Sequence, residues 1–128
     1  MPAFTRLDEI QVWQKARVVT RRIYTITGGG GLGRDFGLRD QIRRSGVSVM
    51  ANIAEGFGRG SDHEFADFLN IAHGSVTETQ SHLYVALDLG YVSKTVFDEL
   101  SAMLDEIVKM TFSLAARLRV RGRKGRTP

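Results

Sequence analysis

The sequence predicts an all-α protein built as an antiparallel, up-down-up-down four-helix bundle. Apolar residues recur at intervals of three and four through four long segments, and no segment shows the two-residue alternation of a strand. Short glycine-rich or turn-forming stretches separate the segments, so consecutive helices are expected to pack antiparallel. The predicted helices cover about 7–27, 35–57, 62–89 and 94–119, and they form one domain over residues 1–120.

The first predicted helix, 7–27, is followed by a run of glycines. Its core-facing residues step by four, three, four and three along the chain, and they are Val12, Ala16, Val19, Ile23 and Ile26. Four consecutive glycines at 28–31 should end the helix, because each costs roughly 1 kcal/mol relative to alanine. The run lacks the Gly-Lys-Ser/Thr of a phosphate-binding loop and has no preceding strand. We therefore expect a mobile interhelical loop at 28–33 and no nucleotide site.

The second predicted helix, 35–57, has one apolar and one polar stripe. The apolar stripe consists of Leu38, Ile42, Gly46, Val49, Ile53 and Phe57, and the polar stripe of Arg44, Ser48, Asn52, Glu55 and Arg59. Gly56, Gly58 and Gly60 punctuate its end, since glycine adopts a left-handed C-terminal cap without steric cost. Ser61 and Glu64 form the pattern of a capping box, so the third helix should begin at once.

The polar stripe admits three interpretations. Arg44, Asn52, Glu55 and Arg59 provide the groups of a phosphate- or carboxylate-binding site, since arginine suits both anions. Alternatively the stripe is a solvated or subunit-facing surface, on which Glu55 and Arg59 form an ordinary i, i+4 ion pair. In the third interpretation Asn52 and Glu55 are a structural polar site, hydrogen-bonded inside an assembly and fixing helix register. The structural roles are favoured.

The third and fourth helices complete the predicted core. The third is expected to bury Phe65, Phe68 or Leu69, Ala72, Val76, Leu83 and Leu87. Ser93 is a candidate N-cap for the fourth helix. That helix carries an unbroken apolar stripe made of Phe97, Leu100, Leu104, Ile107, Thr111, Leu114 and Leu118. The third helix also carries His63, His73 and His82, but no Glu-x-x-His occurs anywhere in the chain, so no metal site is expected.

Composition excludes several classes of protein. The chain has 128 residues and no cysteine, which excludes disulfides, thiolate metal sites and thiol catalysis. No apolar run approaches the roughly 18 residues of a membrane span, and the N-terminus lacks the plan of a signal peptide, so a cytoplasmic protein is expected. No nucleophile elbow or acid–base pair stands out. We therefore expect no enzymatic activity and no cofactor.

The positive charge is concentrated at the C-terminal end. The formal net charge is +4, but all 14 carboxylates precede Arg117, and residues 1–116 carry a net −2. The basic residues of this end are Arg117, Arg119, Arg121, Arg123, Lys124 and Arg126. Residues 121–128 are expected to form a flexible tail. The tail either neutralises phosphates of a nucleic acid or only solubilises the protein, and the sequence leaves both interpretations open.

Residues 51–61, A-N-I-A-E-G-F-G-R-G-S, carry a family resemblance. Together with Q-I-R-R-S-G-V-S-V before them and E-F-A-D-F-L-N-I-A-H-G-S after them, they closely resemble a family of small bacterial four-helix bundles. That family was first noticed as reading frames inside intervening sequences of large-subunit ribosomal RNA genes, and it includes accessory proteins of diversity-generating retroelements. The resemblance extends from about Leu7 to about Leu118. Relatives usually carry proline where this chain has Met50, so a family-typical kink need not occur here.

The resemblance implies a homo-oligomer, most simply a pentameric ring, and suggests two functions. Apolar residues off the main stripes, such as Val18, Val47, Val85 and Leu89, are candidates for subunit contacts. The first function is an accessory protein that binds structured RNA or RNA paired with DNA and presents it to a partner enzyme. Phosphate contacts would then come from Arg39, Arg43, Arg44, Arg59 and the basic residues of the C-terminal end. The alternative is a structural or protein-interaction oligomer without a nucleic-acid ligand.

Overall fold

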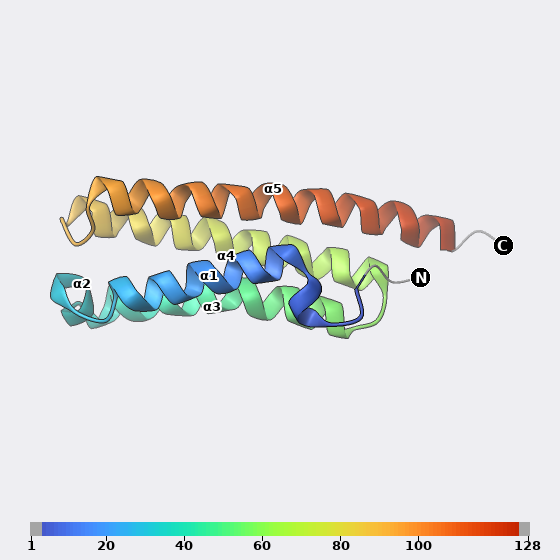
Figure 1. Ribbon diagram of the computed structural model, residues 1–128, viewed down its shortest axis with the longest axis horizontal. Coiled ribbons are helices and arrows are strands. Elements are labelled where there is room, and N and C mark those ends of the chain that lie inside the picture. Colours follow the sequence, from blue (N-terminus) through green and yellow to red (C-terminus); the bar gives the residue numbers. More distant parts are fainter. Residues whose placement is uncertain (1–3, 126–128) are drawn as a thin grey trace.

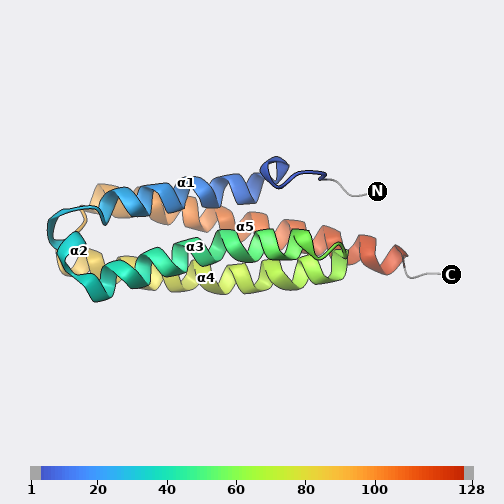
Figure 2. The same cartoon turned by 90° about the horizontal axis from the view of Figure 1, so that it is seen from below.

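Four long helices lie side by side with alternating direction (Figures 1 and 2). The computed structural model describes residues 4–125, with side chains through Arg123. The long helices are α1 (Gln11–Ile26), α3 (Phe36–Gly58), α4 (Asp62–Asp88) and α5 (Lys94–Gly125). A 3-10 helix, η1 (Leu7–Glu9), precedes them, and a short helix, α2 (Gly30–Arg34), joins α1 to α3. No strand occurs within residues 4–125, so the all-α prediction is confirmed.

The core lies along the axis of the bundle and is built from the predicted stripes. The stripe residues Val12, Ala16, Val19 and Ile23 of α1 are buried, as are Ile42, Gly46, Val49 and Ile53 of α3. Leu69 is buried in α4 while Phe68 is half-buried, which decides between the two alternatives. All seven residues of the α5 stripe are buried. Periodicity alone therefore located the core, because burial follows the face of each helix.

The beginning of the first helix differs from the expected start at residue 7. Leu7–Glu9 form the separate η1, and Ile10 adopts an extended backbone with φ −81° and ψ 109° before α1 begins at Gln11. Glu9 stabilises this break, because its Oε1 accepts hydrogen bonds from the backbone N–H of Thr5 at 2.8 Å and of Arg6 at 2.7 Å. The extended residue places the Ile10 side chain in the core, where it is fully buried.

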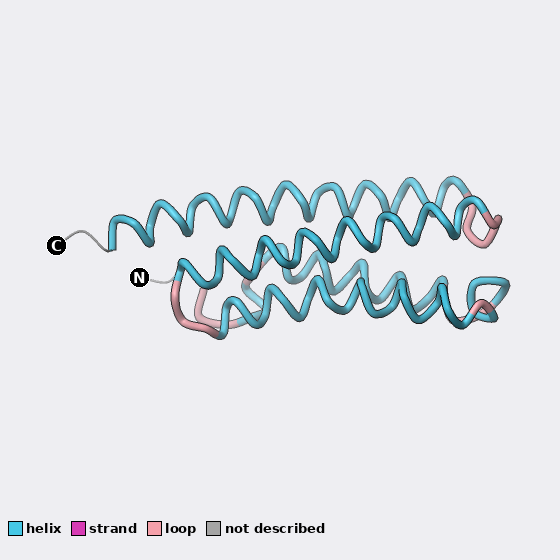
Figure 3. The backbone as a smooth tube through the Cα atoms, turned by 180° about the vertical axis from the view of Figure 1, so that it is seen from behind, coloured by secondary structure: helices cyan, strands magenta, loops and turns pink. Residues whose placement is uncertain are grey.

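The glycine run is structured, and the expectation of a mobile loop at 28–33 was wrong in this respect. Gly30–Arg34 form α2, in which Leu32 is buried in the core. Gly31 packs against the ring of Tyr91, where an added Cβ would lie 2.7 Å from Cδ1. These tertiary contacts override the low helix propensity of glycine, which is only a weak local preference. Figure 3 shows that the loops are confined to the two ends of the bundle.

The C-terminal end of α5 also differs from the prediction. The helix continues to Gly125 instead of ending near residue 119, so residues 121–125 are not the flexible tail that was expected. Arg119 and Arg121 reach the first turns of α4, where they contact Asp67 and Asp62. These contacts give the last turns of α5 a packing partner that its local composition does not reveal. Arg126, at the end of the predicted tail, lies outside the described residues.

The turn between α3 and α4 follows the predicted chemistry in part, since Gly56 and Gly58 lie within α3 and only the serine half of the capping box forms. Gly60 has φ +81°, in the left-handed region that favours glycine. Ser61 caps α4 by accepting a hydrogen bond from the backbone N–H of Glu64 at 3.2 Å. Ser93 caps α5 in the same way, accepting from Val96 N–H at 3.1 Å. α3 remains helical through Met50 from Phe36 to Gly58, as expected where methionine stands in place of proline.

Gly56 sets the closest approach of α3 to α4, and its replacement by alanine is expected to destabilise the protein. A Cβ there would lie 2.6 Å from Cβ of Phe68 and 3.2 Å from Cα of Phe65, so backbone must move. Overpacking of this kind costs about 1–3 kcal/mol, which exceeds the gain in helix propensity of about 1 kcal/mol. We therefore expect Gly56→Ala to lower the free energy of unfolding measured by urea titration.

Gly74→Ala is the matched control for this prediction. Gly74 is exposed in the middle of α4, and nothing lies within 4 Å of a Cβ added there. Its replacement should stabilise the protein by about 0.5–1 kcal/mol through helix propensity alone. Equal effects of the two substitutions would show that Gly56 does not set the helix spacing.

Candidate nucleic-acid interface

Charge is segregated between the helices. α1 and α3 together carry seven Lys and Arg residues but only two carboxylates, Asp40 and Glu55. α4 carries five carboxylates and neither lysine nor arginine. α1 and α3 are neighbours on one side of the bundle (Figure 2). Lys15 and Arg22 pair with carboxylates of α5, and we call the other basic residues of these two helices the basic layer. Two helices with a net positive charge therefore occur within residues 1–116, whose net charge is negative.

Arginine side chains of the basic layer stack on aromatic rings. The Arg43 guanidinium lies 4.5 Å from the ring centroid of Tyr24 and so links α3 to α1. Arg39 lies 4.6 Å from the ring of Phe36, and Arg17 lies 5.7 Å from that of Trp13. A ring beneath a guanidinium holds the cation by its quadrupole and leaves the outer face of the guanidinium available to another partner.

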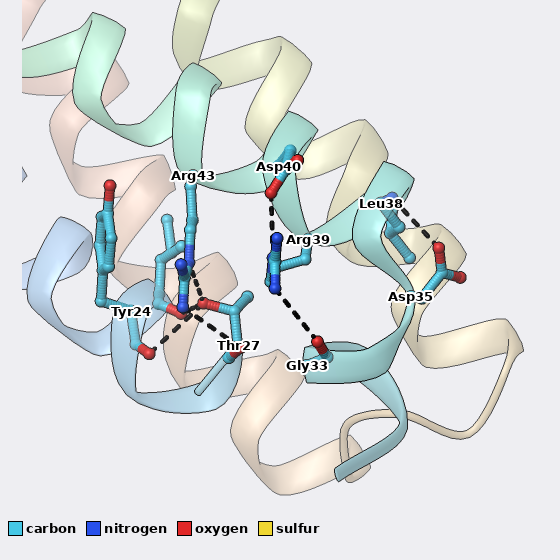
Figure 4. A network of polar contacts seen from close by, with 9 residues as sticks. Tyr24, Thr27, Gly33, Asp35, Leu38, Arg39, Asp40 and Arg43 are labelled. Atoms are coloured by element: carbon cyan, nitrogen blue, oxygen red, sulfur yellow. Dashed lines mark hydrogen bonds and ion pairs between the residues drawn. The ribbon is translucent and has the colours of Figure 1, made fainter. Parts of the chain in front are cut away.

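Arg43 and Arg39 also support the end of α1 and the α2 segment (Figure 4). Arg43 Nε donates to Thr27 Oγ1 at 2.8 Å, and its Nη2 donates to the Thr27 carbonyl at 3.3 Å. Thr27 is the C-cap of α1, where the exposed carbonyls favour a cation. Arg39 donates to the Asp40 carboxylate at 2.9 Å and to the Gly33 carbonyl at 3.4 Å. A phosphate would have to share these two arginines with the fold.

Three other arginines of the basic layer are uncommitted. Arg17, Arg21 and Arg44 are exposed, and none forms a hydrogen bond or an ion pair with the residues that the structure describes. Sequence reasoning named Arg44 but missed Arg17 and Arg21. The sequence does contain a pattern that could have identified them. Arg17 and Arg21 are four residues apart on a helix that has no carboxylate, so no ion pair can form within that helix.

The polar stripe of α3 meets α4 in a seam of hydroxyl groups. The polar seam consists of Ser45, Ser48, Asn52, Ser75 and Thr79. Ser48 Oγ and Ser75 Oγ are 2.8 Å apart, and Thr79 Oγ1 donates to Ser45 Oγ at 2.8 Å in the buried core. Asn52 donates to the Ser48 carbonyl at 2.8 Å. Two hydroxyl pairs of the seam therefore join two helices of the same chain, and Asn52 is bonded within α3.

Glu55 and Arg59 form the ion pair that their spacing predicts. Arg59 Nε and Glu55 Oε2 are 2.9 Å apart, and each side chain is about half exposed. The Arg59 guanidinium also lies 4.9 Å from the ring of Phe68. A solvent-exposed pair of this kind contributes only a few tenths of a kcal/mol, so it leaves Arg59 able to exchange its partner.

The basic residues at the end of α5 are divided between several environments. Arg121 forms a two-pronged ion pair with Asp62, with distances of 2.5 Å and 2.7 Å, and Arg119 lies 3.1 Å from Asp67. The hydrogen bonds from Arg121 hold the pKa of Asp62 below its usual value, and the same contact raises the pKa of Arg121. Arg117 and Arg123 are exposed. The side chain of Lys124 lies outside the described residues.

The histidines do not assemble a metal site in the described part of the chain. His63 Nε2 lies 3.5 Å from the Asp67 carboxylate, and His73 stacks on Phe112 with ring centroids 4.7 Å apart. His82 Nε2 is buried without a hydrogen-bond partner among the described residues. No group of three potential ligands occurs within residues 4–125. None of the helices there is both long and apolar enough to cross a membrane.

The fold defines a class, the small all-α proteins built as antiparallel helical bundles. Residues 8–113 match the 23S rRNA-intervening sequence protein family, and the chain belongs to that family. The structure is similar to that of a protein of unknown function from the S23 ribosomal protein family of Bacteroides thetaiotaomicron, with a TM-score of 0.75 and 28% sequence identity. The alignment covers 81% of this chain and 97% of the other. Comparison with curated proteins gives no match.

The Asp62–Arg121 pair makes a testable contribution to stability that depends on pH. Because the pKa of Asp62 is lowered in the folded state, its contribution is present above the unfolded pKa of about 3.9 and is lost as pH falls through the folded pKa. The pair is about one-third exposed, so its contribution should not exceed about 1 kcal/mol. We expect Arg121→Gln to be less stable than wild type at pH 6, and the difference to vanish in acid.

The control is the same substitution in an Asp62→Asn background. Removal of the carboxylate should reduce the effect of Arg121→Gln at pH 6 and remove the pH dependence of that effect, because the double-mutant cycle isolates the pair. A persistent cost in that background would show that Arg121 stabilises α5 by other contacts.

Proposed function

We propose that this protein is a non-enzymatic, oligomeric helical-bundle protein that binds the phosphate backbone of structured RNA or of RNA paired with DNA. The observation that carries the proposal is the basic layer, with Arg17, Arg21 and Arg44 exposed and uncommitted. Cations that lack a carboxylate partner gain most from a polyanion, because no internal pair has to be broken. Membership of the family of intervening-sequence proteins supports the proposal.

The geometry of the layer favours contacts with phosphates over contacts with bases. Arg17 and Arg21 lie on successive turns of α1, about 6 Å apart along its axis. Their helix packs against α3 along its length, so it presents one flank of arginine side chains. Such a surface follows a backbone without reading sequence. In this proposal Arg39, Arg43 and Arg59 add contacts by exchanging their present partners.

Assembly into a homopentameric ring would strengthen this binding. Val47, Val85 and Leu89 are exposed at 41%, 44% and 54%, and burial against another subunit would stabilise such an assembly. In a ring, five basic layers multiply a weak phosphate affinity through avidity. The bound nucleic acid would then be presented to a partner enzyme.

The test of nucleic-acid binding removes the three uncommitted arginines together. The variant Arg17→Gln/Arg21→Gln/Arg44→Gln should bind a structured RNA at least tenfold more weakly than wild type in a gel-shift assay at about 50 mM salt. The salt dependence of log affinity up to about 200 mM should become shallower by about two to three, since each phosphate contact contributes about 0.9.

A matched variant removes the same charge elsewhere. Arg6→Gln/Lys94→Gln/Lys109→Gln changes exposed cations outside the basic layer and should bind RNA as wild type does. Substitution is preferable to truncation of the C-terminal end, because Arg121 holds α5 to α4. Equal loss in both variants would contradict a specific role for the layer, and unchanged binding in both would sink the proposal.

The second candidate is a structural or protein-interaction oligomer without a nucleic-acid ligand. The exposed apolar residues Val85 and Leu89, four residues apart near the end of α4, fit the oligomer of either candidate. What favours this candidate is the number of arginines that already have partners within the chain. This candidate shares the oligomer with the first and differs only in the ligand.

The oligomer is tested by placing charge on the exposed end of α4. Wild type is expected to elute in size-exclusion chromatography with light scattering at a mass five times that of the 14.2 kDa chain. Val85→Glu/Leu89→Glu should reduce the mass toward that of one chain, because a desolvated carboxylate disfavours the interface. Ala102→Glu, at an exposed position of α5, should leave the mass unchanged. A monomeric wild type would exclude the ring.

A further inference from the structure

A cleft of about 540 Å³ lies between the N-terminal segment and α5. Its position follows from the register of α1 against α5, in which Lys15 pairs with Glu106 and Arg22 with Glu99 at 2.9 Å each. α1 begins only at Gln11, so no turn of α1 packs against the part of α5 that follows about Met110. The N-terminal segment, residues 4–10, crosses this part of α5 in place of a helix, and the cleft remains beside it.

The floor of the cleft is apolar. Its apolar lining comes from Phe4, Ile10 and Val12 in the N-terminal part of the chain and from Met110 and Leu114 of α5. Ile10, Val12 and Leu114 belong to the buried core, so the floor is fixed by the packing of the bundle. The volume falls in the range of about 300–1,000 Å³ that is typical of small-molecule sites.

Three polar residues of α5 rim this floor. Lys109, Ser113 and Arg117 also line the cleft, and they follow one another at four-residue steps, about 6 Å apart along one side of the helix. None of the three forms a hydrogen bond or an ion pair with any residue of the described chain, 4–125. Two long cationic side chains thus flank a hydroxyl, an arrangement that suits an anionic group placed over Ser113.

The one carboxylate in the lining is already engaged. Glu9 Oε1 accepts hydrogen bonds from the backbone N–H of Thr5, the Thr5 hydroxyl and the backbone N–H of Arg6, at 2.8, 2.9 and 2.7 Å. These bonds lower the pKa of Glu9, so it stays ionised and tied to its own segment. The cleft keeps a net positive charge from Lys109 and Arg117, which selects an anion over a cation.

We propose that this cleft binds an amphipathic anion, a small molecule with an apolar body and one carboxylate or phosphate group. The apolar body lies between Val12, Met110 and Leu114, and the anionic group is held by Lys109, Ser113 and Arg117. The site lies on the α5 side of α1 and includes none of Arg17, Arg21 and Arg44, so it is separate from the basic layer.

The test uses methionine methyl groups as local reporters in the full-length protein. Met110 lines the cleft, whereas Met50 and Met103 pack elsewhere against the core. Octanoate and octyl phosphate, titrated below their micellar concentrations, should shift the Met110 methyl signal saturably and leave those of Met50 and Met103 in place. Octylammonium and octyl glucoside, which share the chain but not the negative charge, should bind at least tenfold more weakly.

The two anions also distinguish the source of the anionic group. Tighter binding of octanoate indicates a carboxylate ligand, and tighter binding of octyl phosphate indicates a phosphate ester. Either result supports the site. Equal binding of all four probes, or a joint shift of the three methionines, would overturn it, since the chain alone would then drive a non-specific interaction.

A pair of variants separates the rim from general charge. Lys109→Gln/Arg117→Gln should weaken octanoate and octyl phosphate binding at least tenfold and leave octyl glucoside unaffected. Arg34→Gln/Lys94→Gln removes two exposed cations at the opposite end of the bundle and should bind both anions as wild type does. Circular dichroism checks that each variant is folded. Unchanged anion affinity in a folded Lys109→Gln/Arg117→Gln protein would refute the proposal.

Discussion

The close contact between α3 and α4 is the constraint on which the rest of the bundle depends. Gly56 lets the backbone of α3 approach Phe65 and Phe68, because no Cβ stands between the helices. Farther along the same interface the polar seam joins them through hydroxyl pairs at 2.8 Å. Small residues fix the distance between the helices, and directional hydrogen bonds fix their rotation. The two helices therefore form a rigid hairpin against which α1 and α5 pack.

Ion pairs between the helices decide which cations remain available. Two carboxylates of α5, Glu99 and Glu106, form ion pairs with Arg22 and Lys15 of α1. Carboxylates of α4 form ion pairs with arginines at the end of α5. Some of the cations left over lie on α1 and α3, and others, such as Lys109 and Arg117, lie on α5. A chain whose residues 1–116 carry a small net negative charge can thus expose cations that have no carboxylate partner among the described residues.

The candidate site was only partly predictable. Arg44 was named because it belongs to a periodic polar stripe, and the Glu55–Arg59 pair because its spacing is local. Two other roles depend on partners that are distant in the chain. Arg43 caps α1 through a partner 16 residues away, and Arg121 anchors α5 through a partner 59 residues away. Sequence periodicity shows which side of a helix a residue occupies, but it does not show which neighbouring helix faces that side.

The sequence by itself determined the number of long helices, their buried stripes and their caps, because all three depend on residues within a few turns of one another. Tertiary structure alone decided that the short helix α2 forms in the glycine run, that α5 continues to Gly125 and that a cleft opens beside Met110. None of these features can be predicted from the helix propensity of the residues involved. Each is set by contacts between residues far apart in the chain, whose free energy exceeds the local preference once the helices have packed.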